Sequence, residues 1–152
     1  MASKRQGILE HLANTLFPTI TIAGGYNFNL SGSERGLRST NEMTGNEFPR
    51  LFVASADETV ESVNGQSFIS LMKVYIYGVV ASTTATTAGD VQIQLDKLIE
   101  DTVKVLNVDL TQGNRVSYTN IIEWITDEGD QHPYAFFRMA VNFRYITLLS
   151  AP

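Results

Sequence analysis

Residues 68–80, FISLMKVYIYGVV, decide the fold, because β-branched and aromatic side chains alternate along them with the period of two that marks a strand. Successive side chains of a strand point to opposite faces of its sheet. One row contains Met72, Val74, Ile76 and Val80, and the other contains Lys73, Tyr75 and Tyr77. We expect the first row to face a layer of helices and the second row to lie on the opposite face of the sheet.

The segment 134–149 has the same alternation and predicts a second long strand. Its apolar row contains Phe137, Met139, Val141, Phe143 and Tyr145, and its mixed row contains Phe136, Arg138, Ala140, Asn142, Arg144 and Ile146. The turn residues 127–130 join it to a strand-like segment, 116–126, so the two segments should form an antiparallel hairpin. In one plausible register, Glu123 pairs with Arg138.

The rest of the chain supplies two helices and two shorter strands. Ser3 and Gln6 form a predicted capping box for a helix that runs through Phe17 to Pro18, and a second helix opens near Asp90 and reaches Leu106. Shorter strands are predicted at 26–30 and 50–54, and Asn64-Gly65 is a turn signal. The order α-β-β-β-α-β-β predicts an α+β fold: two helices packed on one face of a mainly antiparallel sheet of about five strands. We expect a single domain, 1–152, with a long polar loop at 31–49.

Two helices are too narrow to cover both faces of this sheet. Five strands about 4.8 Å apart span roughly 24 Å, and two helices about 10 Å in diameter cover roughly 20 Å of one face. The uncovered face is a candidate subunit interface, because tyrosine and arginine combine large contact area with directional hydrogen bonds. The alternative is an amphipathic face in contact with solvent. The candidate residues on this face are Lys73, Tyr75, Tyr77, Arg138, Asn142 and Arg144.

The polar loop contributes further candidates. Arg35 and Arg38, with Arg50 beside them, could bind the carboxylates of a partner. Glu34, Glu42 and Glu47 lie among these arginines and offset their charge. We therefore favour a self-neutralised loop that becomes ordered on assembly.

Composition excludes several classes of function. The net charge of −5 and the absence of a basic run disfavour specific nucleic-acid binding. The chain contains no cysteine, which excludes disulfides, thiol catalysis and zinc-thiolate sites. The polar N-terminus and the lack of an apolar stretch of about 18 residues predict neither a secretion signal nor a membrane anchor.

No motif predicts a cofactor, a metal site or catalysis. His11 and His132 lie in no metal-ligand spacing and beside no nucleophile, so we expect both at the surface. The stretch 31–36 lacks the Gly-Lys-Ser/Thr sequence of a phosphate-binding loop, and the acidic turn at 127–130 lacks the ligand spacing of a calcium loop. We expect a protein that is not an enzyme and that needs no cofactor.

These elements together resemble the tail terminator proteins of long-tailed bacteriophages, also called minor tail or tail completion proteins. The resemblance rests on an N-terminal helix at 8–17, the pair Gly25-Tyr26, the stretch 48–53 (FPRLFV), the single mid-chain helix and the terminal strand at 135–145 (AFFRMAVNFRY). It covers nearly the whole chain as a pattern of elements.

The resemblance implies a structural virion protein without catalytic residues. Proteins of this family form a ring, usually a hexamer, that caps the head-proximal end of the tail tube, stops tail polymerisation and takes part in head-tail joining. The implied partners are copies of the chain itself, the tail tube protein and the head connector or neck protein. The implied location is the virion tail, with the host cytoplasm during assembly.

Two alternatives remain open from the sequence. The chain could be a neck or head-completion protein, or a tail-tube protein, of the same virion. It could instead be a small-molecule binding module with a pocket between helices and sheet near Trp124.

Overall fold

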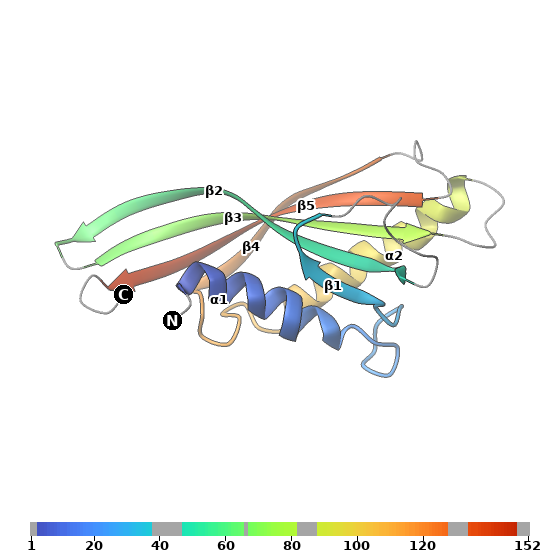
Figure 1. Cartoon of the computed structure of the whole chain (residues 1–152), viewed down its shortest axis with the longest axis horizontal. Coiled ribbons are helices and arrows are strands. Elements are labelled where there is room, and N and C mark those ends of the chain that lie inside the picture. The colour runs from blue at the N-terminus through green and yellow to red at the C-terminus, as the bar shows by residue number, and fades with distance from the viewer. Residues whose placement is uncertain (1–2, 38–46, 66, 82–87, 128–133, 149–152) are drawn as a thin grey trace.

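The computed structural model describes residues 3–37, 47–65, 67–81, 88–127 and 134–148, and these form two layers. The sheet forms one layer, and the helices α1 (Lys4–His11) and α2 (Ala88–Leu106) lie side by side along one of its faces (Figure 1). The predicted α+β fold, with two helices on a mainly antiparallel sheet, is confirmed.

Helix α1 begins at the predicted capping box. The backbone N–H of Gln6 donates to Ser3 Oγ at 3.1 Å, and the backbone N–H of Ser3 donates to Gln6 Oε1 at 3.4 Å. The helical path continues beyond His11 through a π-helical turn, η1 (Leu12–Leu16), and a 3₁₀ turn, η2 (Phe17–Thr19). It ends at Thr19, one residue beyond the predicted end at Pro18, because Ile20 has an extended backbone.

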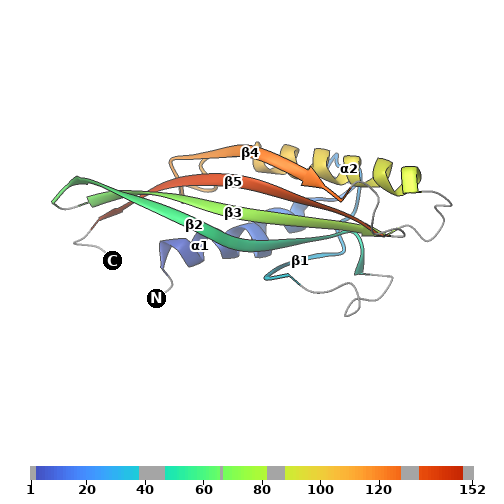
Figure 2. The ribbon, with the colours of Figure 1, turned by 90° about the horizontal axis from the view of Figure 1, so that it is seen from above.

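The sheet has five strands in the order β1-β2-β3-β5-β4. Strands β1 (Gly32–Arg35) and β2 (Arg50–Asn64) are parallel, and the other neighbouring pairs are antiparallel. Strand β3 (Ser67–Ala81) lies at the centre, and β4 (Tyr118–Thr126) and β5 (Tyr134–Leu148) form the predicted hairpin. Seen from above in Figure 2, the strands lie in front of the helices.

The first predicted strand is wrong, and a different strand replaces it. Residues 26–30 do alternate in burial, but their backbone belongs to no strand. The buried carboxylate of Asp101 on α2 accepts from the backbone N–H of Asn27 at 2.9 Å and of Phe28 at 3.2 Å, so a helix side chain takes the place of a neighbouring strand. The real first strand, β1, lies inside the predicted loop 31–49.

Strand β2 is 15 residues long, whereas the sequence predicted only residues 50–54. Its second half is polar, and a bulge between Ser55 and Glu58 interrupts the alternation that marks a strand. This half forms a hairpin with β3 that extends beyond the N-terminal end of α1 (Figure 1).

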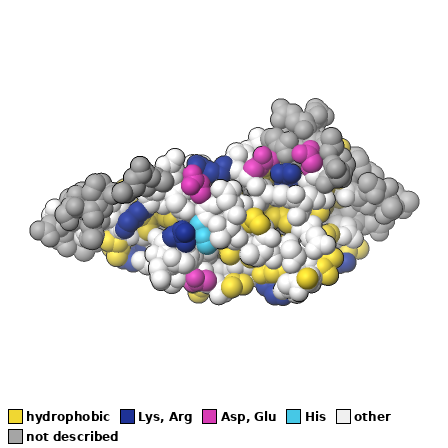
Figure 3. Space-filling view, turned by 60° about the horizontal axis from the view of Figure 1, so that its bottom comes forward, with side chains coloured by type: hydrophobic (Ala, Val, Ile, Leu, Met, Phe, Trp, Pro, Cys, Tyr) yellow, Lys and Arg dark blue, Asp and Glu magenta, His cyan; other side chains and the backbone are white. Residues whose placement is uncertain are grey.

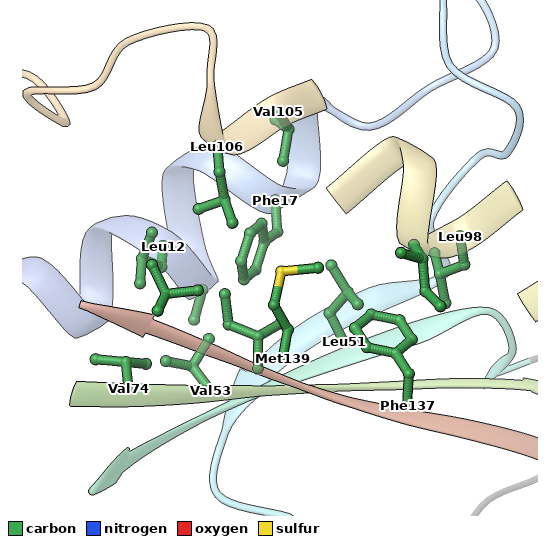
Figure 4. Packing of buried hydrophobic residues seen from close by; sticks show 14 of the residues in the cluster. Leu12, Phe17, Leu51, Val53, Val74, Leu98, Val105, Leu106, Phe137 and Met139 are labelled. Atoms are coloured by element: carbon green, nitrogen blue, oxygen red, sulfur yellow. The ribbon is translucent and has the colours of Figure 1, made fainter. Parts of the chain in front are cut away.

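The predicted rows of β3 and β5 are confirmed. Met72, Val74 and Ile76 are fully buried and face the helices, together with Met139 and Val141 of β5. Leu12 and Phe17 from the N-terminal helical segment and Leu98 from α2 close over these strands (Figure 4). The core therefore lies between the helices and one face of the sheet.

Candidate functional site

The candidate site is the face of the sheet turned away from α1 and α2, which we name the reverse face. All six predicted residues of β3 and β5 lie on it. The residues that alternate with them along each strand belong to the core, and successive residues of a strand point to opposite faces. Tyr77 is paired with Arg138 and Lys73 with Asn142, so the side chains form adjacent rows. Each of the six is partly buried by its neighbours within the chain. The six predicted residues are Lys73, Tyr75, Tyr77, Arg138, Asn142 and Arg144.

Aromatic and cationic side chains contact one another in the middle of the reverse face. The guanidinium of Arg138 lies 4.5 Å from the ring centroid of Tyr75, a cation–π contact. The rings of Tyr75 and Tyr77 meet edge to face with their centroids 6.2 Å apart. Among the described residues, neither Lys73 nor Arg144 has an ion-pair partner. These two cations are therefore available to a partner.

One end of the reverse face is covered by the chain itself, which corrects the expectation that this face is wholly uncovered. Phe52 and Val79 lie on this face, yet each is only 1% exposed. They form a second small core with Phe48, Tyr77 and Phe136. Because Tyr77 packs against this core, it has a structural role as well as a place in the candidate interface.

The pairing of Glu123 with Arg138 is not found. A bulge between Ile121 and Glu123 shifts the register of β4, so that Glu123 lies opposite Ala140 and Ile125 lies opposite Arg138. The extra residue of a bulge displaces every later pair by one position. The sequence contained no signal for this bulge.

The arginines of the polar loop do not join the six sheet residues. Arg35 is exposed and pairs with Val53, which places it in the row that faces the helices. Arg50 is bound by Glu34 at 3.4 Å and Glu47 at 3.7 Å, which confirms the predicted self-neutralisation at this arginine. Arg38 and Glu42 lie outside the described residues.

A hollow of about 420 Å³ lies beside Trp124, between β4 and α2, where the small-molecule alternative places its pocket. Its floor is apolar, with Ile99, Val103 and the indole of Trp124, which is 48% exposed. Asp96, Glu100 and Lys104 also line it. Apolar side chains reach the surface at several places on the helix side of the molecule (Figure 3).

His11 is partly buried, which corrects the expectation of a surface residue. Burial is the main cause that lowers the pKa of His11 below its usual value of 6.5, and the positive charge of Arg115 adds to it. The nearby side chain of Gln112 and the charge of Asp109 act in the opposite direction on this pKa. The neutral form of His11 is thus the form that the fold favours.

The protein should lose stability as the pH falls below about 6.5. The folded state binds the His11 proton more weakly than the unfolded state, because the pKa of His11 is lowered on folding. The contribution of His11 to stability is therefore complete at pH values above its pKa in the unfolded chain. This contribution is lost as the pH falls from that pKa toward the lower pKa of His11 in the folded protein. Melting temperatures measured from about pH 8 to pH 5.5 should show this decline, and His11→Gln should flatten it. An unchanged slope in the variant would contradict the assignment to His11.

Within the residues that the structure describes, no group of three His, Asp or Glu side chains is placed to hold a metal ion. None of the helices in the described ranges combines the length and apolar character needed to cross a bilayer.

Comparisons with known proteins leave the family open. No protein-family model matches the chain, and no curated protein matches it. The resemblance to tail terminators therefore remains a prediction from the sequence.

Proposed function

We propose that this chain is a structural subunit of a bacteriophage tail terminator. A ring of copies, six as the family resemblance implies, caps the head-proximal end of the tail tube, stops tail polymerisation and offers a surface to the head connector. The chain acts in the virion by binding other protein subunits and carries out no reaction.

The reverse face supports this proposal most directly. It combines tyrosine, arginine and lysine side chains, two of which, Lys73 and Arg144, have no ion-pair partner among the described residues. No described helix crosses this face, and its buried residues among those described are Phe52, Val79, Ala140 and Ser67. Interfaces are enriched in tyrosine and arginine, and a buried charge needs a partner. We infer that neighbouring virion proteins cover this face.

Copy number in the particle tests the proposal. Quantitative mass spectrometry of purified virions, with immunogold labelling, should find about six copies at the head–tail junction. Many copies along the tail would indicate a tail-tube protein, and labelling within the head or neck alone would indicate a completion protein. Absence from the particle would reject all three functions.

Reversing one charge on the reverse face should weaken binding to the tail tube without unfolding the chain. Lys73→Glu reverses a charge at the centre of the face, where the minority of interface residues that contribute more than about 1 kcal/mol cluster. We expect the Kd for purified tail tubes, measured by co-sedimentation, to rise about tenfold.

Lys97→Glu is the matched control, because Lys97 is exposed on α2, on the other side of the molecule. It makes the same change in net charge, so tube binding should stay unchanged. Equal weakening by both variants would show that net charge, and not the reverse face, governs binding.

The hollow beside Trp124 favours the second candidate, a small-molecule binding module. Such a ligand would raise the melting temperature, because the stabilisation it gives grows with the logarithm of ligand concentration above the Kd. It would also change the fluorescence of Trp124, the only tryptophan in the chain. A library screen by thermal shift, with Trp124 fluorescence as the second readout, separates this candidate from the terminator.

A further inference from the structure

Both edges of the sheet are open within the described residues. Strand β4 is the outermost strand on one side, and its nine residues pair only with β5. On the other side, β1 pairs with Arg50–Val53 alone, so most of β2 lacks an outer neighbour. Open edges present unpaired backbone N–H and C=O groups, which bind a further strand readily.

The directions of the strands allow the two edges of neighbouring copies to pair. Strands β2, β3, β5 and β4 alternate in direction across the sheet. A second copy placed beside the first in the same orientation therefore brings its β2 antiparallel to β4. This is a head-to-tail contact, which forms a closed ring when its rotation closes.

Strand β1 fixes how far the neighbouring copy must slide. Ile125 of β4 pairs with Arg138 of β5, and Arg138 pairs with Tyr77 of β3. Tyr77 in turn pairs with Phe52 of β2, so Ile125 and Phe52 lie in the same row across the sheet. The edge of β2 at Phe52 is already occupied by β1. The neighbour must therefore shift along the strands by about four residues, or about 13 Å. A sheet that closes on itself requires such a stagger.

After this shift, apolar side chains of the two copies meet on the helix side of the contact between β4 and β2. Val60 pairs with buried Ser70 and thus lies on the helix side, where it is 56% exposed. It falls opposite Ile121 of the neighbouring copy and diagonal to Trp124, which lies opposite Glu58, at the hollow floored by Ile99 and Val103. A valine of one copy then covers an exposed tryptophan of the next.

On the other side of the contact, an acid of one copy meets a neutral polar side chain of the next. Glu61 is exposed and pairs with Ile69, which places it on the reverse face. The shift sets it beside Asn120 of the neighbour, and the cation Arg144 lies one strand further in and two residues along, opposite Tyr118. Asp57 adds a second exposed acid, while Glu58 is held by Arg5 and Tyr145 in its own copy.

We propose that copies of this chain join by adding β4 of one copy to the free part of β2, about residues 55–64, of the next. The occupant of each edge is thus a second copy of this chain. This inference rests on the proposed ring and specifies how its subunits connect, and it leaves the reverse face to other virion proteins.

The absence of cysteine in the chain allows a direct test. Thr59 and Ile122 are exposed on the two edges, and the proposed shift brings them close together. Purified Thr59→Cys/Ile122→Cys protein treated with a short bis-maleimide should give a ladder of covalent multimers in denaturing gels. Each single variant should remain monomeric under the same treatment.

The single variants also test the symmetry of the contact. A covalent dimer from Ile122→Cys alone would show that β4 pairs with β4 about a two-fold axis, which would overturn the head-to-tail join. Val60→Asp in the double-cysteine background should abolish the ladder, because it places a carboxylate against Trp124 in a hollow that Asp96 and Glu100 also line. Ile22→Asp is the matched control, since Ile22 is 59% exposed and lies on neither edge.

Electron microscopy of the same samples separates the two proposals. Rings without a ladder would overturn the edge pairing and leave the terminator function standing. A ladder without rings would support the edge pairing in an open polymer and count against the terminator. Neither rings nor a ladder would reject both.

Discussion

Val141→Asp should lower the free energy of unfolding by about 3–5 kcal/mol, the loss expected for an uncompensated charge in a core. Val141 is fully buried between β5 and the helices, paired with Val74 on one side and Ile121 on the other. Both neighbouring positions are apolar, so the new carboxylate has no partner. Urea denaturation followed by circular dichroism measures the loss.

Asn142→Asp is the matched control, one residue further along the same strand. Asn142 lies on the reverse face beside Lys73, so the new carboxylate gains a nearby cation and partial hydration. The unfolding free energy should change by less than about 1 kcal/mol. Equal losses in the two variants would show that both faces of β5 are buried in solution.

Gly78→Ala should cost up to about 3 kcal/mol, the upper end of the range for overpacking a core. Gly78 lies directly opposite Phe137, whose ring packs over the glycine and is only 1% exposed. A Cβ at position 78 would lie 2.5 Å from Phe137 Cζ and still closer to Cε1. Real side chains do not approach so closely, so the ring must leave its place in the core.

Shortening the opposing side chain should partly rescue this variant. Phe137→Leu alone leaves a cavity and costs stability, but in combination with Gly78→Ala the new methyl group occupies part of that cavity. The double variant should therefore lose less than the sum of the two single losses, by more than about 0.5 kcal/mol. Strict additivity would show that the two positions do not contact each other in solution.

The long strands could be predicted because their signal is local. In 68–80 and 134–149 one row of each strand is mainly apolar, interrupted by Ser70 and Thr147, so the strand type and the buried row follow from the residues. The capping box at Ser3 and Gln6 is equally local. The six reverse-face residues followed from the same alternation, and the structure places all six on one face.

The missed features depend on contacts between distant residues. The alternation at 26–30 indicated burial correctly, but only the fold brings Asp101, more than 70 residues away, to bind this backbone. The four residues of β1 are polar and become a strand because β2 offers them an edge. The bulge in β4 and the half-buried state of His11 likewise depend on packing partners.

The sequence by itself determined the two helices, the long strands and the identity of the buried rows, because hydrophobic periodicity and capping act within a few residues. Only the tertiary structure decided the strand order, the register, the small core at Phe52 and Val79 and the two open edges. Strand order and register are set by which distant segments pair, and the backbone groups that pair are the same in every residue except proline. Side-chain patterns therefore predict which face of a strand is buried, and they leave open which strand lies beside it.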